Sequence, residues 1–417
     1  MAKTIAIVGT LDTKFEEMGY IRDFIEQKGH NALIVDGGIL GNPPFQPQIT
    51  RKEIAQAAGT TLEAIIALGD EGKAIAKMTE GASKIVLDLH SQGKVDAVVS
   101  VGGSMGTSLC LAVMRVLPVG LPKLMVSTIA FSPLVSGGDV ASDQWMGQAP
   151  VDLWGLNTIN KSILKSAAAA IVGMAEVYEK IVPEKPMIGV TTRGILRYLD
   201  WIKPMLEERG YEVVVSPSCG MVGGGSFEKL ISQGLFTAVM DLCTAEILEE
   251  TSGGSLSAGP DRLEMAGKMG LPQIVSTGCM EYWHWPGPAG TIPKWRKTHL
   301  HNPLVLCVKA TTEEMIVAAR RMAEKLNRAK GPVTILFPRG GFGAFDKPGC
   351  IFHDPEGHQA LLETLEKNVK SGINIIELDM HIDDQAFAEK VVSVFDDMME
   401  PHGLSPWYLH KNTLLRP

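Results

Sequence analysis

Short runs of β-branched residues alternate with longer amphipathic stretches along the chain, and this alternation constrains the fold more than any other feature. The apolar runs of the first half lie at 4–8, 32–35, 97–101 and 124–127, with helical stretches at 13–28, 71–92 and 107–116. Those of the second half lie at 187–191, 212–215, 238–242, 273–276, 305–308, 333–337 and 374–378. Strands that alternate with helices form parallel sheets with crossover helices. The sequence therefore predicts an α/β protein with two Rossmann-like lobes.

The boundary between the lobes is expected just after a long helix at 157–180. Pro183 and Pro186 stop that helix and hold the chain extended before a new strand begins. This predicts an N-terminal lobe at 1–183 and a C-terminal lobe at 187–417. Ligands of open parallel sheets bind beyond the carboxyl ends of the strands, so the loops that follow the strands are the places to seek chemistry.

Composition excludes several classes of function. The net charge is −8 without any Lys/Arg-rich run, which argues against a nucleic-acid surface. The longest apolar stretch is broken by Gly173 and is shorter than the ~20 residues that a bilayer requires, so no membrane contact is expected. The 6 cysteines include no Cys-x-x-Cys pair and follow no secretory leader, which predicts reduced thiols in a cytoplasmic protein. Small molecules are the expected partners.

A glycine-rich loop at 101–107 is the first candidate binding site. Its candidate ligand-binding residues are Gly102, Gly103, Ser104, Gly106 and Thr107. Three glycines permit close approach of the backbone to a phosphate, and the helix that follows presents its positive end. The motif matches neither the P-loop nor the dinucleotide fingerprint. The alternative is a tight turn with no ligand.

A second candidate follows the first strand and would face the same crevice. It contributes Gly9, Thr10, Asp12, Thr13 and Lys14, whose hydroxyls and ammonium group would hold a polyphosphate. Alternatively, Asp12 or Thr13 is only the N-cap of the first helix, with Glu16 as its capping-box partner.

Carboxylates at the ends of strands are candidates for binding the ribose and the Mg²⁺ of a nucleotide. Asp36 stands where nucleotide-binding sheets often carry a ribose-binding acid, although it is equally a turn-forming residue before two glycines. Mg²⁺ bound to phosphates needs only one or two protein carboxylates, for which Asp12, Asp36 and Asp143 are the candidates. No dedicated protein metal cage is expected.

The second lobe offers groups that would orient a second substrate. The loop 220–226 is either another anion cradle or a hinge. Arg193, Arg197 and Arg339 suit a carboxylate or phosphate, and each is otherwise a surface ion pair. The aromatic loop 276–288 would wall a pocket or form a subunit interface. Its Cys279 is expected to be inert, since no cationic neighbour is identifiable.

Three histidines are the remaining candidates for catalytic or metal-binding residues. His299 and His301 precede a proline, and His381 follows the last strand. His301 or His381 would act as a general base, and with Arg339 they form the predicted catalytic set. Alternatively, these histidines bind a metal, or they only satisfy loop backbone.

Several motifs together resemble a two-domain ATP-binding family that includes the N-terminal region of the plant tobamovirus-resistance protein. The motifs lie at 9–14, 36–38, 102–107, 155–157, 276–278, 301–303, 354–356 and 381–384. The resemblance implies two α/β lobes, ATP bound mainly by the first, and a homodimer or higher homo-oligomer. It places ATP on the residues of loops 9–14 and 102–107 and on Asp36. The chain differs in an expanded loop at 129–138, in Lys309-Ala310 where Arg-Thr is expected, and in Asp383 where Asn is expected, so a different second substrate is expected.

These observations predict a cytoplasmic ATP-binding enzyme that uses Mg-ATP on a small acidic metabolite in a cleft between the lobes. One alternative is a regulatory module that binds ATP without turnover. Another is a metal-dependent hydrolase or lyase that uses His299, His301 and His381.

Overall fold

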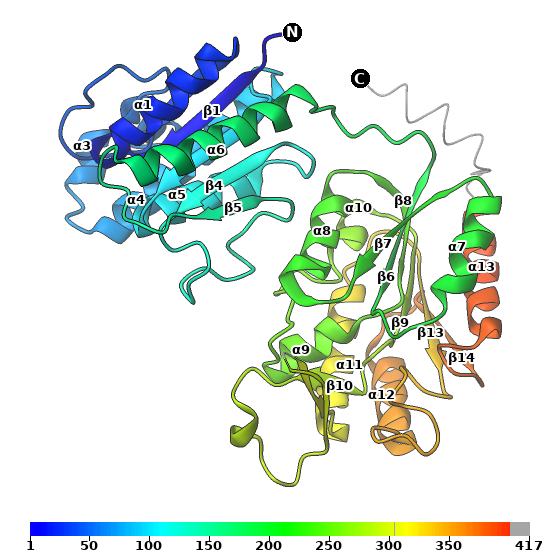
Figure 1. Cartoon of the computed structure of the whole chain (residues 1–417). Coiled ribbons are helices and arrows are strands. Elements are labelled where there is room, and N and C mark those ends of the chain that lie inside the picture. The colour runs from blue at the N-terminus through cyan, green and yellow to red at the C-terminus, as the bar shows by residue number, and fades with distance from the viewer. Residues whose placement is uncertain (304, 401–417) are drawn as a thin grey trace. The chain divides into compact units, whose positions relative to one another are not determined.

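A computed structural model describes residues 1–303 and 305–400 (Figure 1). The chain forms two compact units, Met1–Ile181 and a second unit that starts at Val182. Both units are built on parallel sheets with crossover helices, which confirms the predicted α/β class. Within the described part of the chain, no helix is long and apolar enough to cross a membrane.

The first unit has a five-stranded sheet in the order β2-β1-β3-β4-β5, with all pairs parallel. The strands are β1 (Thr4–Gly9), β2 (Asn31–Asp36), β3 (Ala97–Gly102), β4 (Lys123–Ser127) and β5 (Trp145–Gln148). The helices are α1 (Leu11–Gln27), α2 (Arg51–Ala57), α3 (Leu62–Ile66), α4 (Glu71–Ser91), α5 (Ser104–Val116) and α6 (Thr158–Glu176).

The helices of this unit cover both faces of the sheet. Alternate residues of β1 separate the two cores: Ile5 and Ile7 pack with α1 and α6, whereas Ala6 and Val8 pack with α2, α4 and α5. The chain therefore changes face between β1 and β3, which are adjacent strands. In a doubly wound sheet of this order, that change of face is the expected ligand-binding position.

The second unit has a six-stranded parallel sheet in the order β14-β13-β9-β8-β6-β7. The strands are β6 (Met187–Thr192), β7 (Glu212–Pro217), β8 (Phe236–Asp241), β9 (Gln273–Ser276), β13 (Val333–Pro338) and β14 (Asn374–Leu378). The helices are α7 (Leu199–Glu208), α8 (Gly224–Ser232), α9 (Ala245–Ser252), α10 (Met265–Met269), α11 (Thr312–Leu326), α12 (Pro355–Asn368) and α13 (Gln385–Met399). Its first strand lies between the second and the third, as in the first unit, so the two units share the same starting topology.

A small antiparallel sheet was not anticipated from the sequence. It has the order β10-β12-β11, formed by β10 (Tyr282–His284), β11 (Thr298–Asn302) and β12 (Val305–Lys309). The run at 305–308 is thus a strand, but the expectation that it joins the parallel sheet is wrong. The chain between β9 and β12 contains β10, a short 3₁₀ turn (Ala289–Thr291) and β11, and its described residues include no crossover helix of the kind that parallel pairing requires.

Helix α5 begins at Ser104, three residues earlier than the sequence pattern indicates. Serine, methionine and glycine at 104–106 do not extend the apolar periodicity that marks the rest of the helix. Residues 104–107 of the predicted glycine-rich loop consequently form the first turn of a helix.

Candidate functional site

The carboxyl ends of β1 and β3 come together at the point where the chain changes face. Gly37 N donates a hydrogen bond of 2.7 Å to Gly9 O, which ties the end of β2 to the end of β1. A Cβ on Gly102 would lie only 3.0 Å from Gly106 Cα and from Thr107 N. Glycine at 102 therefore lets the first turn of α5 lie against the strand that precedes it.

The amino end of α5 is open. Its N-cap is Gly103, which has no side chain to accept a hydrogen bond from the first turn, and Ser104 and Met105 are exposed. The first amides of a helix have no partner within the helix. They carry partial positive charge, and this is the arrangement that binds phosphates and carboxylates in many proteins.

Lys14 supplies a cation at the same edge of the sheet. Its side chain is only 9% exposed, and α1 departs from helical geometry there, with φ −127° and ψ 26°. The ammonium donates to Thr13 O at 3.2 Å, and no carboxylate of the described residues pairs with it. A buried charge without a counter-charge is costly, so a bound anion would stabilise this lysine.

Both carboxylate oxygens of Asp36 already have partners within the protein. It is fully buried, Oδ1 accepts from Leu11 N at 3.0 Å and Gly38 N at 2.9 Å, and Oδ2 pairs with Arg51 at 2.9 Å. Both oxygens are therefore engaged within the protein. The alternative of a turn-forming aspartate describes the structure better than a ribose-binding or Mg²⁺-binding acid.

The other two predicted Mg²⁺ ligands also differ from each other. Asp12 is not the N-cap of α1, which is Thr10. Instead, Asp12 Oδ2 accepts from Ile39 N at 2.9 Å and Leu40 N at 3.0 Å, which leaves Oδ1 for a ligand. Asp143 pairs with Lys123 at 2.7 Å, at the start of β4, and so lies at the opposite edge of the sheet. Asp143 cannot act with Asp12.

Three threonines of the predicted site face different surroundings. Thr10 Oγ1 and Thr13 Oγ1 lie 2.9 Å apart in the loop that starts α1. Thr107 is buried, and its Oγ1 lies 2.7 Å from Ser127 Oγ at the end of β4. The Thr107 hydroxyl therefore joins β4 to α5, and Ser104 is the hydroxyl of this turn that faces outward.

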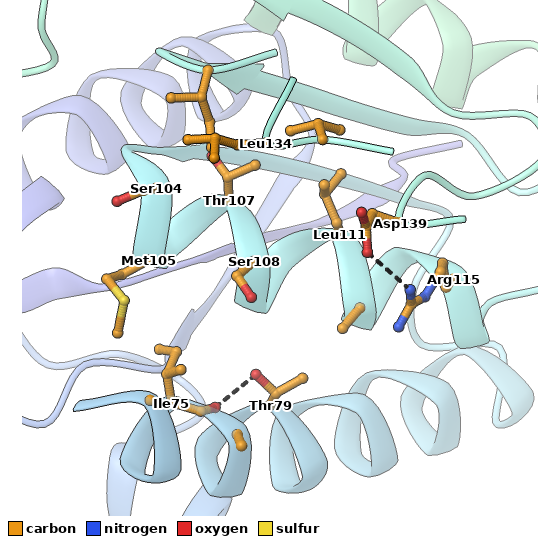
Figure 2. Close-up of a pocket in the computed structure, with 15 residues that line it drawn as sticks. Ile75, Thr79, Ser104, Met105, Thr107, Ser108, Leu111, Arg115, Leu134 and Asp139 are labelled. Carbon is orange, nitrogen blue, oxygen red and sulfur yellow. Dashed lines mark hydrogen bonds and ion pairs between the residues drawn. The ribbon is translucent and has the colours of Figure 1, made fainter. Parts of the chain in front are cut away.

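A pocket of about 610 Å³ opens beside the amino end of α5 (Figure 2). It is lined by Ser104 and Met105 and continues between α4 and α5, where Ile75 and Leu111 provide apolar walls. Leu134, from the loop 129–138, adds a further apolar side chain to the lining of the pocket. At its far end Arg115 forms an ion pair of 3.6 Å with Asp139. Its volume falls within the range of small-molecule sites.

In the second unit, the glycine loop 220–226 already holds an anion of the protein itself. Glu246 Oε1 accepts hydrogen bonds from Gly220 N at 2.6 Å and from Gly224 N at 3.1 Å. The predicted cradle therefore exists, but the buried Glu246 carboxylate fills it.

The predicted catalytic set is not gathered around one pocket. Arg339 is exposed and pairs with Glu377, and Arg197 pairs with Asp200, as the surface alternative expected. His381 Nε2 lies 3.0 Å from Gly343 O, and its Nδ1 accepts from Asp383 N at 3.0 Å. Both ring nitrogens of His381 thus bond to loop backbone, and burial lowers the pKa of this imidazole.

His301 and Arg193 do share a pocket. Its volume is about 470 Å³, and it lies at the carboxyl ends of β6 and β7. His284, Cys307 and Ser218 also line this pocket, and sequence reasoning did not select any of them. His284 lies within the aromatic loop, and its aromatic neighbours indicated a packing role rather than a catalytic one. Within residues 1–303 and 305–400, no group of three or more His, Cys, Asp or Glu is arranged to hold a metal ion.

Comparison with known proteins gives close relatives over nearly the whole length. The UPF0261 protein of Brucella suis is 40% identical over 396 residues, which is 94% of either chain. That of Clostridium tetani is 38% identical over 409 residues, covering 96% of this chain and all of that one. The ToMV susceptible protein tm-1(GCR26) of Solanum lycopersicum is 29% identical over 95% of this chain, but the match spans 56% of the tomato protein.

The predicted resemblance to a two-domain family with a plant member is confirmed by these relatives. The C-terminal domain model of the Uncharacterised protein family (UPF0261) matches residues 185–399, and its N-terminal domain model matches residues 3–180. The chain belongs to the UPF0261 family.

Proposed function

We propose that the first unit binds a nucleotide, with the phosphates at the carboxyl ends of β1 and β3. The observation that carries this proposal is the open first turn of α5 together with the buried Lys14, which no described carboxylate neutralises. These two positive features follow adjacent strands at the change of face in the sheet, where doubly wound sheets bind their ligands. The phosphates would accept hydrogen bonds from the amides of 104–106, and Lys14 would neutralise charge.

The pocket between α4 and α5 would receive the rest of the ligand. It adjoins Ser104 and Met105, and its walls are mostly apolar, as a nucleobase requires. ATP is the first candidate because it is the ligand that the motif resemblance implies for loops 9–14 and 102–107. Mg²⁺ would accompany the phosphates, since it keeps most of its ligands from phosphate and water. Asp12 Oδ1 is the carboxylate oxygen suited to it, whereas Asp36 is fully engaged by Arg51 and two amides.

The test is a thermal-shift titration of the full chain with ATP, ADP, AMP, GTP and NAD, each with and without Mg²⁺. A ligand that binds the native state raises the midpoint, by an amount equivalent to about 2.7 kcal/mol at a hundredfold excess over Kd. We expect a shift with ATP that grows with Mg²⁺ and is lost in Lys14→Ala. Lys77→Ala, a surface lysine of α4 paired with Glu80, is the matched control and should behave as the unaltered protein. An equal ATP shift in Lys14→Ala and unaltered protein would overturn the assignment.

Two wider parts of the proposal need separate measurements. If the protein is an enzyme, ATP should be consumed when small carboxylic acids are supplied, whereas a regulatory module would bind ATP without releasing ADP or AMP. The homodimer implied by the resemblance should appear as twice the chain mass of 44.9 kDa by light scattering. A mass of one chain would remove dimerisation from the proposal and leave nucleotide binding untouched.

A further inference from the structure

The pocket of the second unit brings a thiol and an imidazole face to face. His284 on β10 is directly opposite Cys307 on the antiparallel neighbour β12. Cys307 Sγ lies 3.9 Å from His284 Nε2, and both residues line the pocket. A nucleophile and a base at this separation are within reach of a proton transfer, since such contacts are commonly loose before a substrate binds.

Glu249 fixes the orientation of the imidazole. This glutamate of α9 is fully buried, and its Oε1 lies 2.5 Å from His284 Nδ1. Its Oε2 accepts a hydrogen bond of 3.1 Å from His284 N, which holds the strand as well as the ring. A carboxylate at Nδ1 favours the tautomer with the proton on that nitrogen. Nε2 is then left as an acceptor that faces the thiol.

The surroundings of Cys307 show why it would need such a base. Burial raises the pKa of the thiol to about 12, although the charge of Arg193 acts in the opposite direction. The free thiolate is therefore scarce at neutral pH. The thiol becomes a nucleophile only when a neighbour takes its proton as the new bond forms, which is the function of a general base.

Arg193 lines the same pocket, and its guanidinium lies over the Tyr282 ring, 5.2 Å from the ring centroid. Its Nε donates to Ser218 O at 2.9 Å and its Nη2 pairs with Glu249 at 3.3 Å. Its Nη1 is buried and has no hydrogen-bond partner among the described residues, and the same holds for Ser218 Oγ. The arginine is only 9% exposed, and both residues line the pocket. A guanidinium with a free donor beside a hydroxyl suits a carboxylate.

We propose that this pocket is a catalytic site for small carboxylic acids that also carry an activated acyl group, such as an ester or thioester. Arg193 binds the carboxylate, Cys307 is the nucleophile and His284 is the general base. Glu249 is a positioning residue that acts through His284. The site lies wholly within the second unit and does not depend on nucleotide binding by the first.

The reaction balances with groups that the pocket holds. Cys307 Sγ attacks the acyl carbon as its proton passes to His284 Nε2, and the carbon–sulfur bond forms. The bond to the leaving alcohol or thiol breaks, and that group takes the proton from His284. His284 then takes a proton from water as the water oxygen attacks the acyl carbon of the enzyme thioester and a carbon–oxygen bond forms. The carbon–sulfur bond breaks, the acyl group leaves as a free carboxylic acid, and His284 returns the proton to the Cys307 thiolate.

Alkylation tests the nucleophile and the anion site together without knowledge of the natural substrate. Iodoacetate and iodoacetamide differ only in the carboxylate, and in each case the thiol displaces iodide and its proton passes to the base. Peptide mass spectrometry of the full chain reports which cysteine has reacted. We expect Cys307 to react faster with iodoacetate than with iodoacetamide, and succinate to protect it. Cys350, which is exposed and does not line this pocket, is the internal control and should show no such preference.

Single substitutions separate the general base His284 from the carboxylate-binding Arg193 and the positioning residue Glu249. His284→Gln should lower the rate with both reagents by about 100-fold, the usual contribution of a general base. Arg193→Lys should remove the preference for iodoacetate, and Cys350→Ser, at an exposed position outside the pocket, should change neither rate. Glu249→Gln should slow alkylation, and Glu249→Asp should restore part of the rate, because it retains the carboxylate that a merely structural contact would not need.

The acyl step is tested with two esters, mono-p-nitrophenyl succinate and p-nitrophenyl butyrate. Nitrophenolate release should favour the anionic ester and should be lost in Cys307→Ser. The proposal fails if, in the unaltered protein, Cys307 shows no preference for iodoacetate over iodoacetamide, or if succinate does not protect Cys307. These outcomes need no variant, so a variant that fails to fold leaves the test intact. Release of nitrophenolate by Cys307→Ser at the unaltered rate would overturn the role of the thiol.

Discussion

Arg262 forms two hydrogen bonds with the Asp241 carboxylate, 2.5 and 2.6 Å long, and neither residue is more than 2% exposed. Asp241 ends β8, and its Oδ1 also accepts a hydrogen bond of 2.8 Å from Thr191 Oγ1 on β6. Arg262 Nε bonds to Glu246 at 2.5 Å, the residue that fills the glycine loop. One arginine thereby joins the ends of two central strands to α9 and to the loop 220–224.

Replacing this arginine should be strongly destabilising. Arg262→Met leaves Asp241 and Glu246 buried without their counter-charge, and breaking a buried ion pair in this way costs about 3–5 kcal/mol. Urea unfolding of the second unit should show the loss. Arg197→Ala is the control, because the Arg197–Asp200 pair is exposed and should contribute no more than about 1 kcal/mol. A loss of equal size in the two variants would contradict the buried network.

Two neighbouring glycines should differ in their tolerance of alanine. A Cβ at 102 would lie 2.9 Å from the carbonyl carbon of Gly106, whereas a Cβ at 103 would meet only Thr128 Oγ1, at 3.9 Å. We expect Gly102→Ala to cost about 1–3 kcal/mol, as overpacking does, and to displace the first turn of α5. Gly103→Ala should change stability little. Thermal unfolding measures both, and a loss of ATP shift only in Gly102→Ala would also support the proposed phosphate site.

Asp36→Asn distinguishes a structural aspartate from a ribose-binding one. The change removes the charge that pairs with the buried Arg51, so the free energy of unfolding should fall by about 3–5 kcal/mol. The nucleotide affinity of the molecules that remain folded should stay unchanged. Isothermal titration at low temperature, beside urea unfolding, measures the two quantities. An affinity loss without a stability loss would restore the ribose-binding interpretation.

Glu281 should make stability depend on pH. Its carboxyl oxygens are fully buried and have no hydrogen-bond partner on another described residue, and burial raises its pKa well above the usual value for glutamate. The folded state then keeps a proton that the unfolded state releases above its own pKa. Its contribution is therefore fully present in acid and is lost as pH rises towards the pKa of the folded state.

The variant Glu281→Gln removes that proton exchange. Relative to the unaltered protein, it should gain more stability at about pH 8 than at about pH 5, as measured by urea unfolding. Glu212→Gln, at an exposed position on β7, is the control and should show no such difference. A gain that is the same at both pH values would show that Glu281 does not bind a proton on folding.

Local sequence pattern was sufficient for much of the fold. Strands β1, β3 and β6 are fully or almost fully buried, and their continuous apolar runs stand out from the polar helices around them. The long helix expected at 157–180 is α6, and Asn157 is its N-cap, accepting a hydrogen bond from Asn160 N. The amino end of α5 and Lys14 could be found as candidates because the segments that contain them follow the apolar runs of β3 and β1.

Tertiary structure decided which of the candidate polar groups remain available to bind a ligand. Asp36, Thr107 and the loop 220–224 look like ligand-binding groups in the sequence, but Arg51, Ser127 and Glu246 engage them from distant positions. No local pattern shows such a partner.

The sequence by itself determined the α/β class, the two parallel sheets and the loops at the carboxyl ends of their strands where a ligand was expected. These features follow from hydrophobic periodicity over a few residues. Only the tertiary structure placed His284 opposite Cys307 and Glu249 behind His284. That arrangement depends on the antiparallel register of β10 and β12 and on the packing of α9, which are set by contacts between residues far apart in the chain. Burial and hydrogen bonding, rather than residue type, decide which side chains are free to act.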